Sequence, residues 1–281
     1  MLILASALFG ASVPSVSKIA LEVVSPVGAL FFRALLSTIL FALYFSIIRR
    51  PYSMNTLQRT WKYSLLLVFN FAAALIALGY IPTALIPVVY ATIPLITLLL
   101  NKLINKTEVI SPLRIVGILV GFLGVFLATV SRGFASINSD VIFGVMWILA
   151  GSVSFSLYTI LSKKHQRNTD PLHLIFSSTI LAACITLPFV ISDYISHPYL
   201  LDITWVHFLA LVVTAVIGTV LFYSVYQYSI KHSDSVTVSL FTYIQPIFAI
   251  LLSILLLGET VNAIFVLGTA ITLTGAYLAS R

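Results

Sequence analysis

The sequence has few charged residues. Lysine, arginine, aspartate and glutamate make up 8% of its 281 positions, against roughly a quarter in an average soluble domain. A soluble fold of this size would lack the polar side chains needed to cover its surface, so that class is excluded. Disorder is excluded as well, because 60% of the residues are hydrophobic and 12% are aromatic, whereas disordered segments lack such residues. A protein embedded in a membrane remains.

Cysteine is nearly absent. The single Cys184 lies in an apolar run, which excludes a disulfide framework and a cysteine metal site. No G-x-S-x-G, no H-E-x-x-H and no pair of intramembrane aspartates occurs, and the five histidines lie at segment ends or in loops. We therefore expect no enzyme, no metal and no cofactor. A membrane-embedded enzyme, or a channel or receptor without carrier activity, is the alternative.

Long apolar runs dominate the chain. Each is close to the length of about 20 residues that crosses the hydrocarbon layer as a helix. Runs such as 236–257 do not alternate polar and apolar residues, as barrel strands would. The predicted fold is an all-α, polytopic membrane protein whose ten transmembrane helices span residues 2–20, 27–48, 62–80, 83–104, 112–131, 141–161, 172–192, 205–229, 234–257 and 262–280.

Basic residues fall almost entirely on one side of this predicted topology. The other side holds only Lys18 and Arg132, and Arg33 lies within the second span. Because cytoplasmic loops carry the excess of lysine and arginine, we expect a cytoplasmic-membrane protein with both termini in the cytoplasm. The net charge of +7 then reflects loops that contact anionic lipids, so no nucleic-acid partner is expected. The twelve residues on the cytoplasmic side are Arg49, Arg50, Arg59, Lys62, Lys102, Lys106, Arg114, Lys163, Lys164, Arg167, Lys231 and Arg281.

The two halves of the chain resemble each other. A shift of 151 positions places Glu108 on Glu259, Gly117 on Gly268 and Gly124 on Gly275. Five spans are an odd number, so a second copy must enter the membrane from the opposite side. The sequence thus predicts two inverted five-helix repeats, at 1–132 and 133–281. Inverted repeats allow a binding site to open alternately to either side of the membrane.

One stretch of the second half carries a family resemblance. Residues 238–249, Val-Ser-Leu-Phe-Thr-Tyr-Ile-Gln-Pro-Ile-Phe-Ala, followed by Leu256-Leu257-Gly258-Glu259, resemble the end of an EamA domain. That domain is the repeat unit of the drug/metabolite transporter superfamily. The resemblance extends over the whole chain as two EamA repeats. It implies ten helices in an inverted repeat, a central cavity, and export or exchange of small metabolites.

Prolines inside the spans indicate where a substrate binds. Interrupted helices in corresponding positions of two repeats mark the sites of transporters, and each proline frees a carbonyl one turn earlier. A simple packing kink is the alternative, and interfacial anchoring is an equal alternative for the tyrosine and glutamine at 226 and 227. The predicted substrate-binding residues lie on the third, fourth, eighth and ninth spans: Asn70, Tyr90, Pro94, Tyr223, Tyr226, Gln227, Thr242, Gln245 and Pro246.

A second set, Ser12, Pro14, Arg33, Pro87 and Ser156, is predicted to serve gating or structure. Arg33 lies about 9 Å inside the second span at 1.5 Å per residue. It either snorkels outward or faces the cavity and attracts a carboxylate, and we favour a structural or gating role. Small hydroxyl residues such as Ser156 also let helices pack closely.

Three glycines of the fifth span and two of the tenth predict close helix packing, either within the chain or in a homodimer. We expect a monomer or a weak homodimer. No carboxylate lies at mid-membrane depth, so proton coupling should be weak or indirect, or transport should be facilitated diffusion. The predicted function is a membrane carrier, of the exporting kind, that moves a small organic metabolite such as an amino acid by alternating access. Its expected partners are that substrate and membrane lipids.

Overall fold

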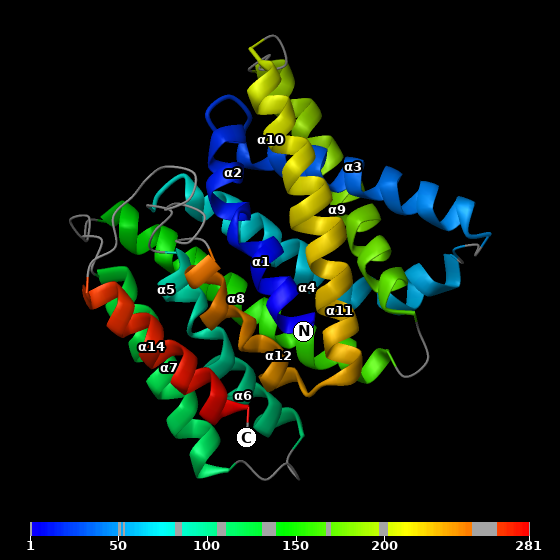
Figure 1. Ribbon diagram of the computed structural model, residues 1–281. Helices are drawn as coiled ribbons and strands as arrows, with labels where there is room; N and C mark the ends of the chain where they lie inside the picture. Colours follow the sequence, from blue (N-terminus) through cyan, green and yellow to red (C-terminus); the bar gives the residue numbers. More distant parts are fainter. Residues whose placement is uncertain are drawn as a thin grey trace.

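The computed structural model describes residues 2–49, 52, 54–81, 86–105, 111–130, 139–166, 170–196, 202–248 and 263–280. These residues form helices and short connections, and no strand occurs among them (Figure 1). The elements are α1 (Leu2–Ala11), α2 (Val13–Ala20), α3 (Pro26–Ile47), α4 (Met54–Leu78), α5 (Ile86–Tyr90), α6 (Ile93–Ile104), α7 (Pro112–Val130), α8 (Ser139–His165), α9 (Pro171–Ser196), α10 (Trp205–Ala215), the π-helix η3 (Val216–Leu221), α11 (Phe222–His232), α12 (Ser235–Ser239) and α14 (Ala263–Ala279).

Six helical segments in the described chain are long and apolar enough to cross a membrane. They are Leu2–Ala20, Pro26–Ile47, Asn55–Leu78, Ser139–His165, Pro171–Ile195 and Trp205–His232. Shorter apolar helices cover Ile93–Ile104, Pro112–Ala128, Ser235–Phe248 and Ala263–Ala279. The predicted all-helical membrane fold is thereby confirmed, while the count of ten spans stays a prediction. The Glu108–Glu259 pair of the predicted repeat lies outside the described residues.

Three of the apolar segments are interrupted. The first breaks at Ser12, between α1 and α2, and Pro14 lies in the first turn of α2. The fourth breaks between α5 and α6, with Pro94 in the first turn of α6. In the ninth, α12 ends and a turn at Leu240 precedes the helical residues 241–248, which contain Pro246. Proline is tolerated in a first helical turn because the amide it lacks would have no helical partner there.

Helices α7 and α14 pack through glycine. They lie side by side (Figure 1), and a Cβ added to Gly275 would stand 2.1 Å from the backbone nitrogen of Gly121. A Cβ on Gly268 would stand 2.6 Å from the nitrogen of Ala128. Only glycine allows backbones this close. Of the two alternatives for these glycines, the structure therefore shows packing within the chain.

A side-chain contact joins the start of α3 to the end of α9. Ser25 is the N-cap of α3 and accepts a hydrogen bond from the Gly28 amide. Its hydroxyl donates to the Asp193 carboxylate near the end of α9 at 2.5 Å. A capping residue of this kind fixes where a helix begins. The bond to Asp193 then holds the start of α3 against the end of α9.

Candidate functional site

A cavity lies between helices of the first and second halves of the chain. Its free volume is about 680 Å³, including the part open to solvent. Its walls combine apolar and aromatic side chains with a few polar ones, as such sites usually do. The lining residues come from the interrupted segments and from α3, α4, α8, η3 and α11.

Aromatic rings form much of the wall. Phe71 of α4 packs edge-on against Tyr223 of α11, with ring centres 5.1 Å apart. The Phe222 and Tyr223 rings are 4.6 Å apart. Phe155 of α8 and Phe241 complete this face, at 6.1 Å from each other. Edge-to-face pairs of this kind are stabilising beyond the area that they bury.

Among the described residues that line the cavity, Arg33 has the one cationic side chain. It is buried, with 7% of its surface exposed. Its Nε donates to the Thr219 hydroxyl at 2.6 Å, and its Nη2 donates to the Gly218 carbonyl at 2.8 Å. Both acceptors belong to the π-helix η3; π-helical turns are rare and occur frequently at functional sites.

Gln245 supplies the hydrogen-bond donor that Pro14 lacks. Proline has no amide, so the carbonyl of Gly10, four residues earlier, lacks its helical donor. The Nε2 of Gln245 donates to that carbonyl at 2.6 Å, which joins the first and ninth segments across the cavity wall. A side chain at position 10 would crowd Gln245, because an added Cβ would stand 3.1 Å from that same Nε2.

This arrangement predicts an interaction between Pro14 and Gln245. Gln245→Leu removes the only side-chain donor described for the Gly10 carbonyl, and should lower the free energy of unfolding by about 1 kcal/mol. In a Pro14→Ala background the new amide can bond the carbonyl, so the same substitution should cost less. Unfolding of the four proteins in detergent measures the interaction as a double-mutant cycle; additive effects would contradict it.

The remaining polar contact of the wall comes from Asn70 on α4. Its Nδ2 donates to the Gly151 carbonyl of α8 at 3.1 Å. Tyr90, the last residue of α5, is close enough for a hydrogen bond to the Asn70 side chain. Asn70 thus links α4 to α8 and faces Tyr90 in the same cavity.

The structure brings some of the predicted residues together and separates others. Asn70, Tyr90, Tyr223 and Gln245, together with Pro14 and Arg33, line the cavity. Thr242 is buried and bonds the Ser239 carbonyl of its own segment at 2.9 Å. The side chain of Pro87 lies outside the described residues. The predicted residues that are described but do not line the cavity are Ser12, Pro94, Ser156, Tyr226, Gln227, Thr242 and Pro246.

Tyr226 and Gln227 belong to a buried polar cluster between α8 and α11, which we call the polar plug: Tyr158, Thr159, Gln166, Tyr226 and Gln227. The Gln227 amide donates to the Tyr158 hydroxyl and accepts from Gln166. The Thr159 and Tyr226 hydroxyls bond each other at 2.7 Å. Tyr226 and Gln227 are both fully buried, and neither is among the residues that line the cavity.

Ser156 likewise joins two helices and does not line the cavity. Its hydroxyl accepts from Thr97 of α6 at 3.0 Å, and both residues are buried. The hydroxyl residues of α8 therefore hold α6 and α11 against it, as small polar residues do between membrane helices.

One part of the polar plug contacts the cavity wall, and another part borders a second pocket. Phe155 lines the cavity and stacks on Tyr226, with ring centres 5.1 Å apart. Gln166 lines the second pocket, whose free volume is about 1270 Å³ including solvent. That pocket lies between the ends of α6, α8 and α11 and the start of α12, and it is lined by Lys163, Lys164 and Lys231.

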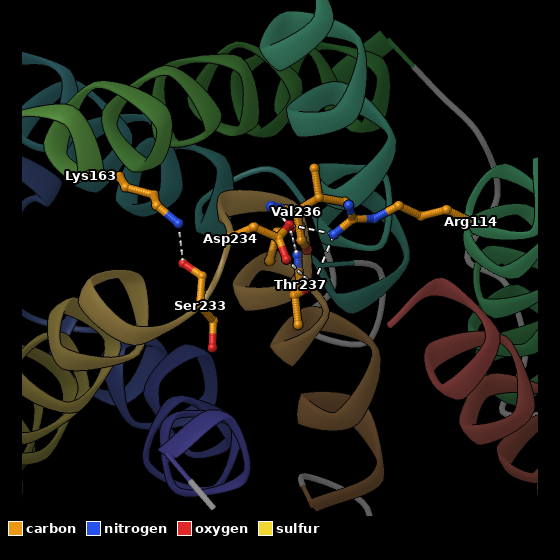
Figure 2. A network of polar contacts seen from close by, with 7 residues as sticks. Arg114, Lys163, Ser233, Asp234, Val236 and Thr237 are labelled. Atoms are coloured by element: carbon orange, nitrogen blue, oxygen red, sulfur yellow. Dashed lines mark hydrogen bonds and ion pairs between the residues drawn. The ribbon is translucent and has the colours of Figure 1, made fainter. Parts of the chain in front are cut away.

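Beside the second pocket, Asp234 connects the two halves of the chain (Figure 2). It caps α12 by accepting from the amides of Val236 and Thr237, at 3.1 and 3.0 Å. The Arg114 guanidinium of α7 reaches it and also donates to the Thr237 hydroxyl at 2.9 Å. Partial burial raises the pKa of Asp234, but the hydrogen bonds from Thr237 and the charge of Arg114 outweigh this, so the pKa lies below its ordinary value.

A lowered pKa fixes how the stability contribution of Asp234 depends on pH. The contribution is complete above the unfolded-state pKa of about 3.9 and is lost as the pH falls through the lower folded-state pKa. Asp234→Asn keeps the cap and loses the charge, whereas Asp234→Ala loses both and should cost about 1 kcal/mol more. Denaturation of the three proteins at pH 7 and pH 3 measures both effects. Equal stability of the two variants would contradict the capping role.

Several residues of the cavity were not among the predicted ones. Phe71, Phe155, Phe222 and Phe241 sit in apolar runs, where an aromatic residue facing lipid looks the same as one facing a cavity. Gly218 owes its place in the wall to the π-helix, for which the sequence carries no signal.

Comparison with known proteins agrees with this architecture. The EamA-like transporter family matches residues 1–130 and 142–281. A solved structure titled only as a crystal structure of a protein aligns with a TM-score of 0.73 and 18% identity, covering 99% of this chain and 95% of that one. At this identity the likeness shows the fold alone.

Curated relatives carry transporter names. An uncharacterized inner membrane transporter, YedA, of Escherichia coli strain K12 is 30% identical over 66% of this chain and 57% of its own length. An uncharacterized transporter of Archaeoglobus fulgidus is 24% identical over 60% of this chain and 57% of its own. An S-adenosylmethionine uptake transporter of Rickettsia conorii is 28% identical over 51% and 48%. The matched part of the chain thus spans about half the length of these relatives.

Fold, cavity and comparisons define the class: a multi-pass membrane protein of the transporter type. The family match covers nearly the whole chain. The chain therefore belongs to the EamA-like transporter family, as the resemblance in its second half predicted.

Proposed function

We propose that this protein is a carrier, of the exporting kind, for a small organic metabolite and works by alternating access in the cytoplasmic membrane. The observation that carries the proposal is the pair of cavities on shared helices. Segments α6, α8 and α11 border both, and the polar plug lies between them. A barrier between two cavities on one path is what a carrier needs in order to open to one side at a time.

The proposed topology has ten spans in two inverted repeats, 1–132 and 133–281, with both termini in the cytoplasm. The shorter helices α6, α7, α14 and the Ser235–Phe248 segment then complete the six long ones. In this topology the second pocket and its lysines face the cytoplasm, in keeping with the positive-inside rule. The substrate-contacting residues are Asn70, Tyr90, Tyr223 and Gln245, which the cavity brings together.

The test is counterflow in vesicles that contain the purified protein. Vesicles loaded with a mixture of unlabelled amino acids and small carboxylates receive each labelled compound outside. A carrier accumulates its labelled substrate transiently, and the unlabelled compound inside accelerates entry. A channel would show flux without this acceleration, and an enzyme would convert the compound without flux; either result contradicts the proposal.

The same vesicles test energy coupling. None of the acidic residues in the described part of the chain lines the cavity, so the wall offers no carboxylate to carry a proton. We expect counterflow to persist, within about twofold, when the pH gradient is collapsed. Flux that stops with the gradient would contradict this expectation.

A further inference from the structure

Arg33 is a buried cation without an acidic partner among the described residues. Its contacts are the hydroxyl and carbonyl of η3, and the Phe71 ring, whose centre lies 4.6 Å from Cζ. Among the described residues, Arg114 forms an ion pair with Asp234, and the Nε2 of His207 lies 3.8 Å from the Glu22 carboxylate. A buried charge that lacks a counter-ion is unfavourable, so an anion arriving beside it would be bound strongly.

Part of the guanidinium is left without a protein partner among the residues that the structure describes. Two of its nitrogens, Nε and Nη2, are held by Thr219 and Gly218, while Nη1 has no hydrogen-bond partner in the described chain. The side chain lines the cavity, so the free edge of the fork is available to a ligand there. A planar guanidinium matches a carboxylate in geometry and charge.

The second pocket also carries an excess of positive charge. Lys164 and Lys231 are exposed on its wall and form no ion pair in the described residues. Lys163 donates to the Ser233 carbonyl (Figure 2). The acidic residue of this pocket, Asp234, is already paired with Arg114. A mouth with excess positive charge raises the local concentration of anions.

We infer that the substrate carries a carboxylate on a small apolar or aromatic body, and that Arg33 binds the carboxylate inside the cavity. The aromatic wall of Phe71, Phe155, Tyr223 and Phe241 receives the body. Thr219 acts as a positioning residue, since it fixes the guanidinium through Nε. This inference rests on the proposed carrier function and names the substrate class of the same site.

The test is equilibrium binding of phenylacetate and of its neutral amide, phenylacetamide, to the purified protein. The wild type should bind phenylacetate at least about tenfold more tightly than the amide, as expected for a charge-assisted hydrogen bond. Arg33→Gln should remove that preference, and Arg33→Lys should keep part of it. Thr219→Val, which leaves the charge in place, should weaken phenylacetate binding by a smaller factor and leave binding of the amide unchanged.

Ser37→Ala is the matched structural control. Ser37 lies one turn after Arg33 on α3 and donates to the Ala215 carbonyl at 3.3 Å, so it joins the same two segments without charge. If Arg33 only holds helices together, Arg33→Gln will weaken the binding of phenylacetate and of phenylacetamide by the same factor, as Ser37→Ala does. That result overturns the inference. Equal binding of acid and amide, or no phenylacetate binding by the wild type, overturns it as well.

These outcomes are separable from those of the carrier proposal. Arg33-dependent binding without counterflow would support the anion site and contradict the carrier. Counterflow of neutral or cationic compounds that is unaffected by Arg33→Gln would support the carrier and contradict the anion site.

Discussion

Gly275→Leu should abolish folding of this protein. A side chain at position 275 begins 2.1 Å from the backbone nitrogen of Gly121, and backbone cannot move aside as a flexible side chain can. Overpacking costs about 1–3 kcal/mol even where neighbours adjust, and here the α7–α14 contact itself must separate. We expect a loss of at least about 3 kcal/mol, seen as aggregation in size-exclusion chromatography of the detergent-solubilised protein.

Thr274→Leu provides the control for this prediction. Thr274 is exposed on the same helix, and its hydroxyl bonds only the Ala270 carbonyl one turn earlier, at 2.9 Å. Leucine at 274 should leave the elution profile unchanged. Monodisperse Gly275→Leu protein, with stability equal to that of Thr274→Leu, would show that α7 and α14 do not pack through glycine.

Gln227→Leu should be the most damaging substitution in the polar plug. Gln227 is fully buried and bonds both Tyr158 and Gln166. Leucine leaves the Tyr158 hydroxyl and the Gln166 amide without this partner, and each buried group that loses its partner costs about 1–3 kcal/mol. We expect the free energy of unfolding in detergent to fall by about 3 kcal/mol.

A neighbouring serine offers the comparison. Ser229 is also buried on α11, but its hydroxyl bonds only the Val225 carbonyl of its own helix, at 2.9 Å. Ser229→Ala should cost less than about 1 kcal/mol, because no second helix loses a partner. If the two variants are equally stable, the contacts of Gln227 do not hold α8 to α11.

The sequence predicts the class of fold well because hydrophobic length is a property of each segment alone. The interruptions at Pro14 and Pro94 follow from proline chemistry in the same local way. The sequence does not predict whether a polar residue points into the cavity or packs between two helices. Asn70 and Tyr90 were predictable as polar groups that avoid lipid, but Tyr226 and Gln227 carry the same signal and lie in the polar plug instead.

Arg33 shows where sequence reasoning stops. Its depth can be counted from Pro26, the first residue of α3, but its orientation depends on η3, whose widened turn presents Thr219 and Gly218. The sequence of residues 216–221 does not predict a π-helix. The sequence favours a structural or gating role for Arg33, and the structure adds that the side chain lines the cavity.

Thiol labelling tests alternating access most directly, because Cys184 is the only cysteine in the chain. In a Cys184→Ser background, Ala74→Cys places one thiol in the cavity wall. A membrane-impermeant methanethiosulfonate is then applied to right-side-out and to inside-out vesicles. The proposed carrier predicts labelling of Ala74→Cys in both kinds of vesicle; labelling in only one of them, or in neither, would contradict it.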